Sequence, residues 1–414
     1  MVMSAVLSVL FWATLALVAY TYAGYPAMIG FLAWARPRPW RRAPYAAGVS
    51  IILPVYNAPL LATRQIRRLL AMDYPGEAEL IVVCDGSQDG TYAAVCALAG
   101  ELRDPRMRIF TYPERCGKAG ALNLALRQAR LEIALFVDVR PEPEPGSIPR
   151  LLESFADPSV GCVAGELLLR RHEQGPCTSA IGGLYWRYEQ WLRRLEARVD
   201  SPSGVYGGFY AARRSLVRAL PEGCVTDDLF QPLAIVRQGY RCVFDDRARV
   251  WDAWPKDMRG EFVRKVRTLA GNFQLLELAP WVLTRENRIR FQFVSHKLLR
   301  LIVPYLLAAL LLLSALRAGE PAYRAMLWAQ LGAYALAAVG LLWDRNPLRR
   351  ITGPFAAFTL LNSAAVAGLY QFLHRRVQLW RIWAPQAAVD TAAVPPPASP
   401  DLAADGEGRT RQAA

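Results

Sequence analysis

Charged residues are absent from long stretches at both ends of this 414-residue chain. Residues 1–35 carry none, and the same holds for three later runs, residues 301–316, 325–343 and 351–373. A helix needs about 20 apolar residues to cross the hydrocarbon core of a bilayer. The second run reaches that length only if Leu298 and Leu299 join it and Arg300 extends its charge toward the interface. We therefore expect a transmembrane anchor over residues 1–35 and about three transmembrane helices over residues 298–373.

Basic residues beside these runs indicate which side of the membrane the flanks occupy. Four of them follow the first run directly: Arg36, Arg38, Arg41 and Arg42. Arginine-rich flanks stay in the cytoplasm, so the middle of the chain is expected there. Three further crossings would put the end of the chain outside, whereas Arg375, Arg376 and Arg381 favour the inside. One run is therefore re-entrant or interfacial, and the sequence leaves open which one.

The formal net charge of +14 raises the question of a nucleic-acid partner. The arginines crowd the flanks of the apolar runs and residues 259–300, where anionic lipid headgroups account for them. No zinc-finger or aromatic RNA-binding motif is present, so we expect a membrane partner and no nucleic acid. Seven cysteines without a Cys-x-x-Cys pair indicate reduced thiols. Residues 386–414, rich in Ala, Pro and Asp, are expected to be disordered.

Residues 48–290 mix charges with short apolar segments and are long enough to form a full core. The pattern predicts strands at 49–53, 79–83, 107–111 and 133–137, alternating with helices at 59–71, 91–99 and 118–130. This alternation predicts an α/β domain with a doubly wound, mostly parallel sheet. Such sheets bind ligands beyond the carboxyl ends of their strands, where Pro54, Tyr56, Asn57, Asp85 and Asp138 lie. The missing Gly-x-Gly-x-x-Gly and Walker A sequences argue against a dinucleotide-binding protein and an ATPase.

Five short motifs follow one another through this region. They are Ser50-Ile-Ile-Leu-Pro-Val-Tyr-Asn57, Val82-Val-Cys-Asp-Gly-Ser-Gln-Asp-Gly-Thr91, Gly117-Lys-Ala-Gly-Ala-Leu-Asn123, Phe136-Val-Asp138 and Thr226-Asp-Asp228. In this order the chain resembles the family-2 glycosyltransferases, over residues 49–271. The resemblance implies a GT-A fold flanked by transmembrane helices, and inverting transfer of a sugar from a nucleotide sugar, with a UDP-sugar as the expected donor. It also implies an enzyme of the bacterial inner (plasma) membrane whose catalytic domain faces the cytoplasm.

Residues on the donor side follow from this resemblance. It implies that Asp85 binds the nucleotide base, while Pro54, Tyr56 and Asn57 wall the pocket for base and ribose. Asp-Gly is also a common tight-turn pair, and that structural role for Asp85 stays open. Lys118 begins a predicted helix, so its ammonium and the helix N-terminus are expected to face a diphosphate together.

Asp138 ends the strand that carries the Asp-x-Asp metal motif of the resembling family. The resemblance implies that Asp138 binds a divalent cation, and hard oxygen ligands suit Mg²⁺ or Mn²⁺. The second acidic position of the motif is Arg140 in this chain, which departs from the family pattern. Arg140 either contacts phosphate itself or lies at the surface. It also motivates the alternative of a non-catalytic homologue that binds a nucleotide sugar.

Thr226-Asp-Asp228 stands where the family has its base motif. The resemblance assigns Asp228 as the catalytic base that takes a proton from the acceptor hydroxyl, with Asp227 supporting it. A base opposite the leaving group implies direct displacement with inversion. The structural alternative is a helix start, with Thr226 as its cap and two acids in its first turn. The Gly-rich residues 204–214 resemble the acceptor-side segment, where glycines let the backbone approach a sugar.

The acceptor is expected at the membrane, as a lipid-linked saccharide or a saccharide, because the predicted anchors hold the domain near the bilayer. Aromatic residues at 185–191 face such an acceptor or the membrane surface, or belong to the core. Residues 262–271 lack the Gln and the Trp of the Gln-x-x-Arg-Trp motif of processive polysaccharide synthases. Single addition is therefore favoured over a processive exopolysaccharide synthase. Arg264 and Arg267 share one helical face and contact either phosphate or lipid headgroups.

Overall fold

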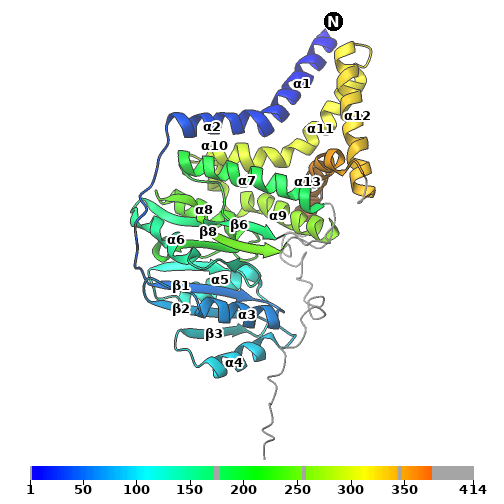
Figure 1. Cartoon of the computed structure of the whole chain (residues 1–414). Helices are drawn as coiled ribbons and strands as arrows, with labels where there is room; N and C mark the ends of the chain where they lie inside the picture. The colour runs from blue at the N-terminus through cyan, green and yellow to red at the C-terminus, as the bar shows by residue number, and fades with distance from the viewer. Residues whose placement is uncertain (1, 171–177, 254–257, 344–346, 375–414) are drawn as a thin grey trace, which may run out of the picture. The chain divides into compact units, whose positions relative to one another are not determined.

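The computed structural model describes residues 2–170, 178–253, 258–343 and 347–374, which belong to one compact unit, Met1–Trp383. The predicted disordered tail and the arginines after the last apolar run lie outside the described residues. Within them, a layered α/β region and a group of apolar helices can be followed in Figure 1.

An eight-stranded sheet forms the centre of the α/β region, in the order β3-β2-β1-β4-β7-β6-β8-β5. The strands are β1 Val49–Val55, β2 Ala78–Asp85, β3 Met107–Tyr112, β4 Ile133–Val137, β5 Glu142–Pro143, β6 Val160–Arg170, β7 Phe209–Arg213 and β8 Arg241–Ala253. The first four strands are parallel, as the alternating pattern predicts. β7 is antiparallel to β4 and β6, and β5 is antiparallel to β8, so the second half of the sheet is mixed.

Helices cover both faces of this sheet. Successive side chains of a strand point to opposite faces, and in this sheet both faces carry apolar side chains that need to be buried. In β1, Ile51 and Leu53 join one hydrophobic core, whereas Ile52 joins the other. The first core is closed by α3 Pro59–Leu70, α4 Thr91–Leu102 and α6 Ser147–Glu153. The second is closed by α5 Gly117–Gln128 and α8 Asp227–Arg237. The region is therefore doubly wound, as predicted.

Among the residues that the structure describes, four helical stretches are long and apolar enough to cross a membrane: Val2–Ala35, Arg290–Leu316, Pro321–Leu342 and Arg350–His374. The first consists of α1 Val2–Ala19, a π-helical turn Tyr20–Gly24 and α2 Tyr25–Ala35. The π turn accounts for the bend between α1 and α2 in Figure 1. The later stretches contain α10 Arg290–Phe293, a second π turn Val294–Leu298, α11 Leu299–Leu316, α12 Pro321–Leu342 and α13 Arg349–His374. Phe11, Leu310 and Leu313 pack α1 against α11.

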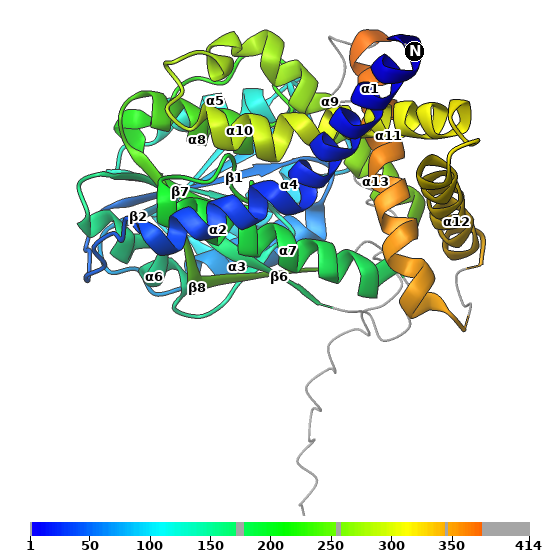
Figure 2. The same ribbon diagram turned by 90° about the horizontal axis from the view of Figure 1, so that it is seen from above.

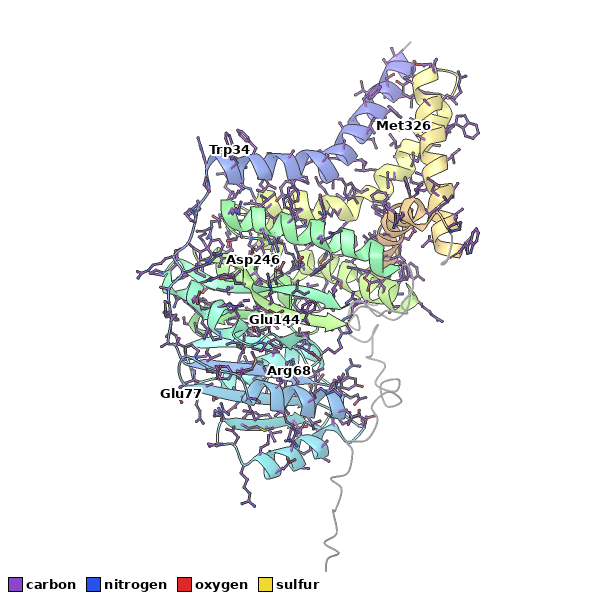
Figure 3. The ribbon with its side chains drawn as sticks, in the orientation of Figure 1. Trp34, Arg68, Glu77, Glu144, Asp246 and Met326 are labelled. Carbon is purple, nitrogen blue, oxygen red and sulfur yellow. The ribbon has the colours of Figure 1, made fainter. Side chains whose placement is uncertain are left out.

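Helix α7, Thr178–Val199, connects α2 to the sheet. Figure 2 shows α2 and α7 running side by side. Ile29 and Leu192 are buried between the two helices, and the Tyr25 hydroxyl donates a 2.6 Å hydrogen bond to Glu196. On the opposite face of α2, Trp34 is 78% exposed and points away from the sheet in Figure 3. α2 thus has one face on the protein and one apolar face turned outward.

Two of the arginines that follow α2 bind carboxylates of the α/β region. Arg38 Nη1 lies 2.9 Å from Asp200 Oδ2, and Arg42 Nε lies 3.3 Å from Asp245 Oδ2. Lipid headgroups therefore do not account for the whole of this basic flank, because part of it anchors the chain to its own domain.

Helix α9, Met258–Leu278, packs against α13. The rings of Phe273 and Phe372 stack with their centroids 6.2 Å apart. A Cβ on Gly368 would lie 3.0 Å from the backbone nitrogen of Ala270, so glycine permits the close approach. Helix α9 also hydrogen-bonds to the loop before α8 through Gly271 and Gln274, so it links the apolar helix α13 to the region of the predicted acids.

Candidate active site

The loops after β1 and β2 are joined through Asn57. Its backbone NH donates to Ser87 Oγ at 3.1 Å, and its side-chain oxygen accepts the NH of Gln88 at 3.0 Å. Asn57 has φ +45°, a left-handed conformation that asparagine tolerates better than most residues. Pro54 is still part of β1, where it pairs in register with Val83. Of the predicted pocket walls, Asn57 therefore shapes the loops, and Pro54 belongs to the strand.

Asp85 lies at the end of β2 and is 3% exposed. Its Oδ1 accepts the backbone NH of Cys116 at 2.7 Å, directly before α5. Burial raises the pKa of the Asp85 carboxyl, while the amides of Cys116 and Gly117 favour its ionised form. Beside it, the Arg115 guanidinium lies 3.8 Å from the centre of the Tyr56 ring. Asp85, Tyr56 and the start of α5 thus form one connected corner of the site.

Lys118, in the first turn of α5, brings two of the predicted acids together. Its Nζ lies 3.1 Å from Asp138 Oδ1 and 3.3 Å from Asp227 Oδ2, and donates to the Gly207 carbonyl at 3.2 Å. Burial lowers the pKa of Lys118, but the surrounding carboxylates outweigh it and raise the pKa above the ordinary value. The ammonium is therefore firmly charged and joins β4, α8 and the glycine segment.

Asp138 is 39% exposed at its side chain, far more open than the neighbouring acids. Arg140 contacts another acid of the protein, because its Nη2 lies 3.2 Å from Asp252 Oδ2. Tyr206 donates its hydroxyl to the same Asp252 oxygen at 3.1 Å. Arg140 thus has a partner in the protein, a buried acid on β8 that lies 112 residues away in sequence.

Asp138 could bind a divalent cation only together with ligands from outside the protein. The described residues contain no group of three or more His, Cys, Asp or Glu side chains that could hold a metal ion. Mg²⁺ and Mn²⁺ sites on nucleotide substrates commonly use one or two carboxylates, with phosphate and water oxygens as the other ligands. Asp138, with its exposed oxygens beside Lys118, is the residue that suits this arrangement.

Asp227 and Asp228 begin helix α8 in two different environments. Asp227 is 4% exposed and faces Lys118. Burial raises its pKa to about 6, while Lys118 opposes that shift. Asp228 is less buried and lies against Gly207, where an added Cβ would come within 3.0 Å of the Asp228 Cβ. Burial also raises the Asp228 pKa, opposed by Lys118, Arg193 and Lys297.

Thr226 occupies the cap position of α8, but its side chain makes no capping hydrogen bond. It donates instead to the Gly271 carbonyl of α9 at 3.3 Å. The predicted helix start is confirmed, with Thr226 at the cap position and both acids in the first turn, but the Thr226 side chain attaches α8 to α9 instead of capping the helix. Gln274 of α9 binds the same loop through Val225 NH at 3.1 Å and the Gly223 carbonyl at 3.0 Å.

We expect Asp227→Asn to stabilise the fold at pH 8. The folded-state pKa of about 6 lies above the ordinary 3.8, so the folded protein holds this proton more tightly than the unfolded chain does. The ionised carboxylate thus costs stability above pH 6, and that cost fades as the pH falls toward 3.8. The variant should gain roughly 1–3 kcal/mol at pH 8 and less at pH 5, measured by unfolding of the detergent-purified protein. A variant less stable than the wild type at pH 8 would contradict this, and exposed Asp73→Asn should show no such pH dependence.

Two arginines of α9 were predicted to bind phosphate or headgroups, and the structure shows the acids around them. Arg264 pairs with Glu261 at 3.0 Å, whereas Arg267, one turn on, lies in the electrostatic field of Asp227 and Asp138. Burial lowers the pKa of Arg267, and these acids oppose the shift. Of these two predicted phosphate or headgroup contacts, Arg264 is thus paired within α9, whereas the charge of Arg267 is felt by the acids of the site. Asp252 carried no sequence signal, since its relevance comes only from the fold.

The sequence from residue 50 to residue 220 matches the family model described as Glycosyl transferase family 2. This chain carries a family 2 glycosyl transferase domain. It is 25% identical over 238 residues to the poly-β-1,6-N-acetyl-D-glucosamine synthase of Staphylococcus aureus strain COL, covering 55% of each protein. The N-acetylglucosaminyltransferase of Rhizobium meliloti strain 1021 is also 25% identical, with 55% of this chain and 56% of that protein covered. The chain therefore spans about half the length of the curated relatives it matches.

Among solved structures, the mannosyltransferase PcManGT from Pyrobaculum calidifontis, in complex with GDP-Man and Mn²⁺, has a similar fold. Its TM-score is 0.66 at 24% sequence identity, and the match covers 88% of this chain and 99% of that one. The family 2 domain thus has the predicted GT-A fold. The similarity also extends beyond the domain into the flanking helices, because it covers more of the chain than residues 50–220.

Proposed function

We propose that this protein is an inverting glycosyltransferase that moves a sugar from a nucleotide sugar to an acceptor presented at a membrane. One observation carries the proposal: Lys118 joins the open carboxylate of Asp138 to the buried acids at the start of α8, within a family 2 domain. Such an arrangement combines a cation for a departing diphosphate with a carboxylate for an attacking hydroxyl.

The donor is assigned to the corner formed by Asp85, Tyr56 and the start of α5. Asp85 accepts hydrogen bonds, which suits the imide of a uracil base, so a UDP-sugar is the expected donor. Lys118 and the N-terminus of α5 supply positive charge for the diphosphate. A Mg²⁺ or Mn²⁺ ion held by Asp138 would neutralise the charge that develops on the leaving diphosphate.

The acceptor is assigned to the side of Asp228. Asp227 is occupied by Lys118, whereas Asp228 lies beside the glycine segment and is less buried. Asp228 takes the proton of the acceptor hydroxyl as the oxygen attacks the anomeric carbon. The bond to the diphosphate breaks on the opposite side, so the anomeric configuration inverts.

The membrane location is part of the proposal. In the described part of the chain four candidate spans flank or follow the domain, and α2, α9 and α13 pack on the helices around the site. We assign the domain, residues 48–290, to the cytoplasmic side of a bacterial plasma membrane, between an anchor at residues 1–35 and helices at residues 298–373. Arginines 36, 38, 41 and 42 support this orientation.

A second candidate is a polysaccharide synthase that uses UDP-N-acetylglucosamine. Two of the relatives favour it, since they are a poly-β-1,6-N-acetyl-D-glucosamine synthase and an N-acetylglucosaminyltransferase. The missing Gln-x-x-Arg-Trp motif favours single addition instead. The length of the product separates the two.

The test incubates the protein in lipid nanodiscs with labelled nucleotide sugars, lipid extract and Mn²⁺, Mg²⁺ or a chelator. We expect one donor to label an organic-extractable product in the presence of metal. A long water-soluble polymer would support the synthase instead. Failure of every donor, with the protein folded and metal present, would overturn the catalytic proposal and leave the non-catalytic homologue.

We expect Asp138→Asn to remove most of the metal stimulation in this assay, because the amide lacks the charge that a hard cation requires. Donor affinity in the presence of Mn²⁺, measured by calorimetry, should fall toward its value with chelator. Asp73→Asn, an exposed substitution far from the strand ends in sequence, serves as the control. Unchanged Mn²⁺ dependence in Asp138→Asn would show that the ion binds elsewhere.

A further inference from the structure

A second group of charges lies between α7 and the start of α11, apart from the strand ends. Glu189 of α7 is at its centre and is 4% exposed at its side chain. Its carboxylate accepts from Lys297 Nζ at 2.7 Å and from Arg300 Nη1 at 2.7 Å, and Arg193 Nη2 lies 3.6 Å away. We call Arg193, Lys297 and Arg300 the cation cluster. One carboxylate thus serves three cations.

The cation cluster is buried, and its three positive charges share the single carboxylate of Glu189. The side chains of Arg193, Lys297 and Arg300 are 12%, 14% and 13% exposed. Within the described part of the chain, Arg193 Nε and Arg300 Nε and Nη2 are buried without a hydrogen-bond acceptor. Buried cations are normally paired, and buried donors normally have acceptors. The cluster therefore has both the charge and the free donors to bind a further anion.

Neighbouring groups do not supply that anion. His296 contacts Glu189 and Glu196 through its two ring nitrogens, at 3.0 and 2.8 Å. Glu196 is thereby shared with His296 and with Tyr25 Oη, rather than with the cations. A fourth cation, Lys265 of α9, is paired with Glu261, whose Oε1 lies 3.7 Å from the Lys265 Nζ. Burial lowers the Lys265 pKa, and Glu261 opposes that shift. The nearby carboxylates Glu196 and Glu261 are thus each bound by groups other than the three cations of the cluster.

The position of the cluster relates it to the acceptor side of the proposed active site. Arg193 and Lys297 are among the groups that oppose the rise of the Asp228 pKa, so their charges reach the proposed base. Lys297 and Arg300 also belong to the candidate membrane span Arg290–Leu316. Aromatic rings lie beside the cations, with the Arg300 guanidinium 5.5 Å from the Tyr188 ring and Lys265 Nζ 5.4 Å from the Tyr185 ring. An anion bound here would be next to apolar helices, and it would bind to cations whose charge acts on Asp228.

We propose that the cation cluster binds the phosphate group of a lipid-borne acceptor and thereby presents that acceptor to Asp228. Guanidinium groups bind phosphate oxygens through paired donors, which matches the free nitrogens of Arg193 and Arg300. The apolar tail of such a lipid would lie along the helices that carry Lys297 and Arg300. The inference rests on the proposed function, since it names the acceptor class for the same site. The same chemistry is offered by a lipid monophosphate and by a diphosphate that links a lipid to a saccharide.

A binding measurement independent of catalysis tests the inference. The probes are a polyprenyl monophosphate, a polyprenyl diphosphate-linked saccharide, the uncharged polyprenol and phosphatidylglycerol, each added to the detergent-purified protein. We expect one of the two polyprenyl phosphates to bind, and the polyprenol and phosphatidylglycerol to bind at least about tenfold more weakly. The better phosphate probe identifies the source of the anion. Equal binding of phosphatidylglycerol would assign the cluster to membrane headgroups and overturn the proposal.

Arg193→Gln and Arg300→Gln are the test variants, since each keeps a hydrogen-bonding side chain beside Glu189. Both should weaken binding of the polyprenyl phosphate by about 10- to 100-fold, as loss of a charge-assisted contact predicts. Arg187→Gln and Arg290→Gln, which replace exposed arginines on α7 and α10, should bind like the wild type. Unchanged binding in both test variants would overturn the assignment. Thermal unfolding identifies a variant that fails to fold, and the other variant then decides.

Transfer assays separate this inference from the proposed function. In both test variants, KM for the phosphate-bearing acceptor should rise, while affinity for the donor stays within about twofold. Lipid-phosphate binding by a wild-type protein that transfers no sugar would contradict the proposed function alone. Transfer to acceptors without lipid-phosphate binding would contradict this inference alone.

Discussion

Asp228→Asn is expected to lower kcat by about 10²- to 10⁴-fold, the usual contribution of a general base. Asparagine has nearly the same shape but cannot take the acceptor proton. Donor affinity should change by less than about twofold, because the donor is assigned to Asp85, Lys118 and Asp138 on the other side of the site. Initial rates with the accepted donor, together with calorimetric binding of that donor, measure both quantities.

The matched control for this substitution is Asp246→Asn, an exposed acid on β8 that is labelled in Figure 3. It should keep wild-type rates. Asp228→Glu, which retains the carboxylate but displaces it, should recover part of the activity. If Asp228→Asn retained wild-type kcat with bound donor, the role of base would have to move to another residue.

Lys118→Gln is the second substitution with a large expected effect. Lys118 neutralises Asp138 and Asp227 at 3.1 and 3.3 Å, and it is assigned to the donor diphosphate. Losing both contributions should lower kcat/KM by roughly 10²- to 10³-fold, in line with the loss of two interactions with charged groups. Arg127→Gln, an exposed substitution on the same helix α5, should have little effect.

The pH dependence of Lys118→Gln gives an independent reading of the same contact. Burial raises the pKa of Asp227 to about 6, and Lys118 works against that rise. Without the ammonium, the pKa of the Asp227–Asp228 pair should rise further. Because the base must be ionised to act, the acid limb of the pH–rate profile should move to higher pH. An acid limb that stays where it is in the wild type would show that Lys118 does not act on these acids.

The N-terminal half of the domain could be predicted from the sequence because its structure is local. Continuous apolar strands, such as residues 133–137, alternate with helices, and this order predicts parallel pairing. β6, β7 and β8 were not identified, and β7 has only five residues, Phe209–Arg213. Its antiparallel place between β4 and β6 is set by contacts with strands far away in sequence.

In the candidate site, too, some residues could be predicted from the sequence and others could not. Asp85, Asp138 and Asp228 follow strands or begin a helix, so position along the chain indicates them. Arg140 pairs with Asp252, and Glu189 pairs with residues of the π turn Val294–Leu298 and of the start of α11, more than 100 residues later. No spacing rule relates such residues, because only the packing of α7, α9 and α11 brings them together. The assigned roles of the individual residues remain predictions until variants are measured.

The anomeric configuration of the transferred sugar tests the central claim most directly. The site places the proposed base, Asp228, and the donor-side group, Lys118 with Asp138, at different parts of one cluster, which supports a single displacement. Proton NMR of the product formed from an α-linked nucleotide sugar reads the new linkage. We predict a β linkage in the product, with one nucleoside diphosphate released for each sugar transferred. An α-linked product would contradict direct displacement at Asp228.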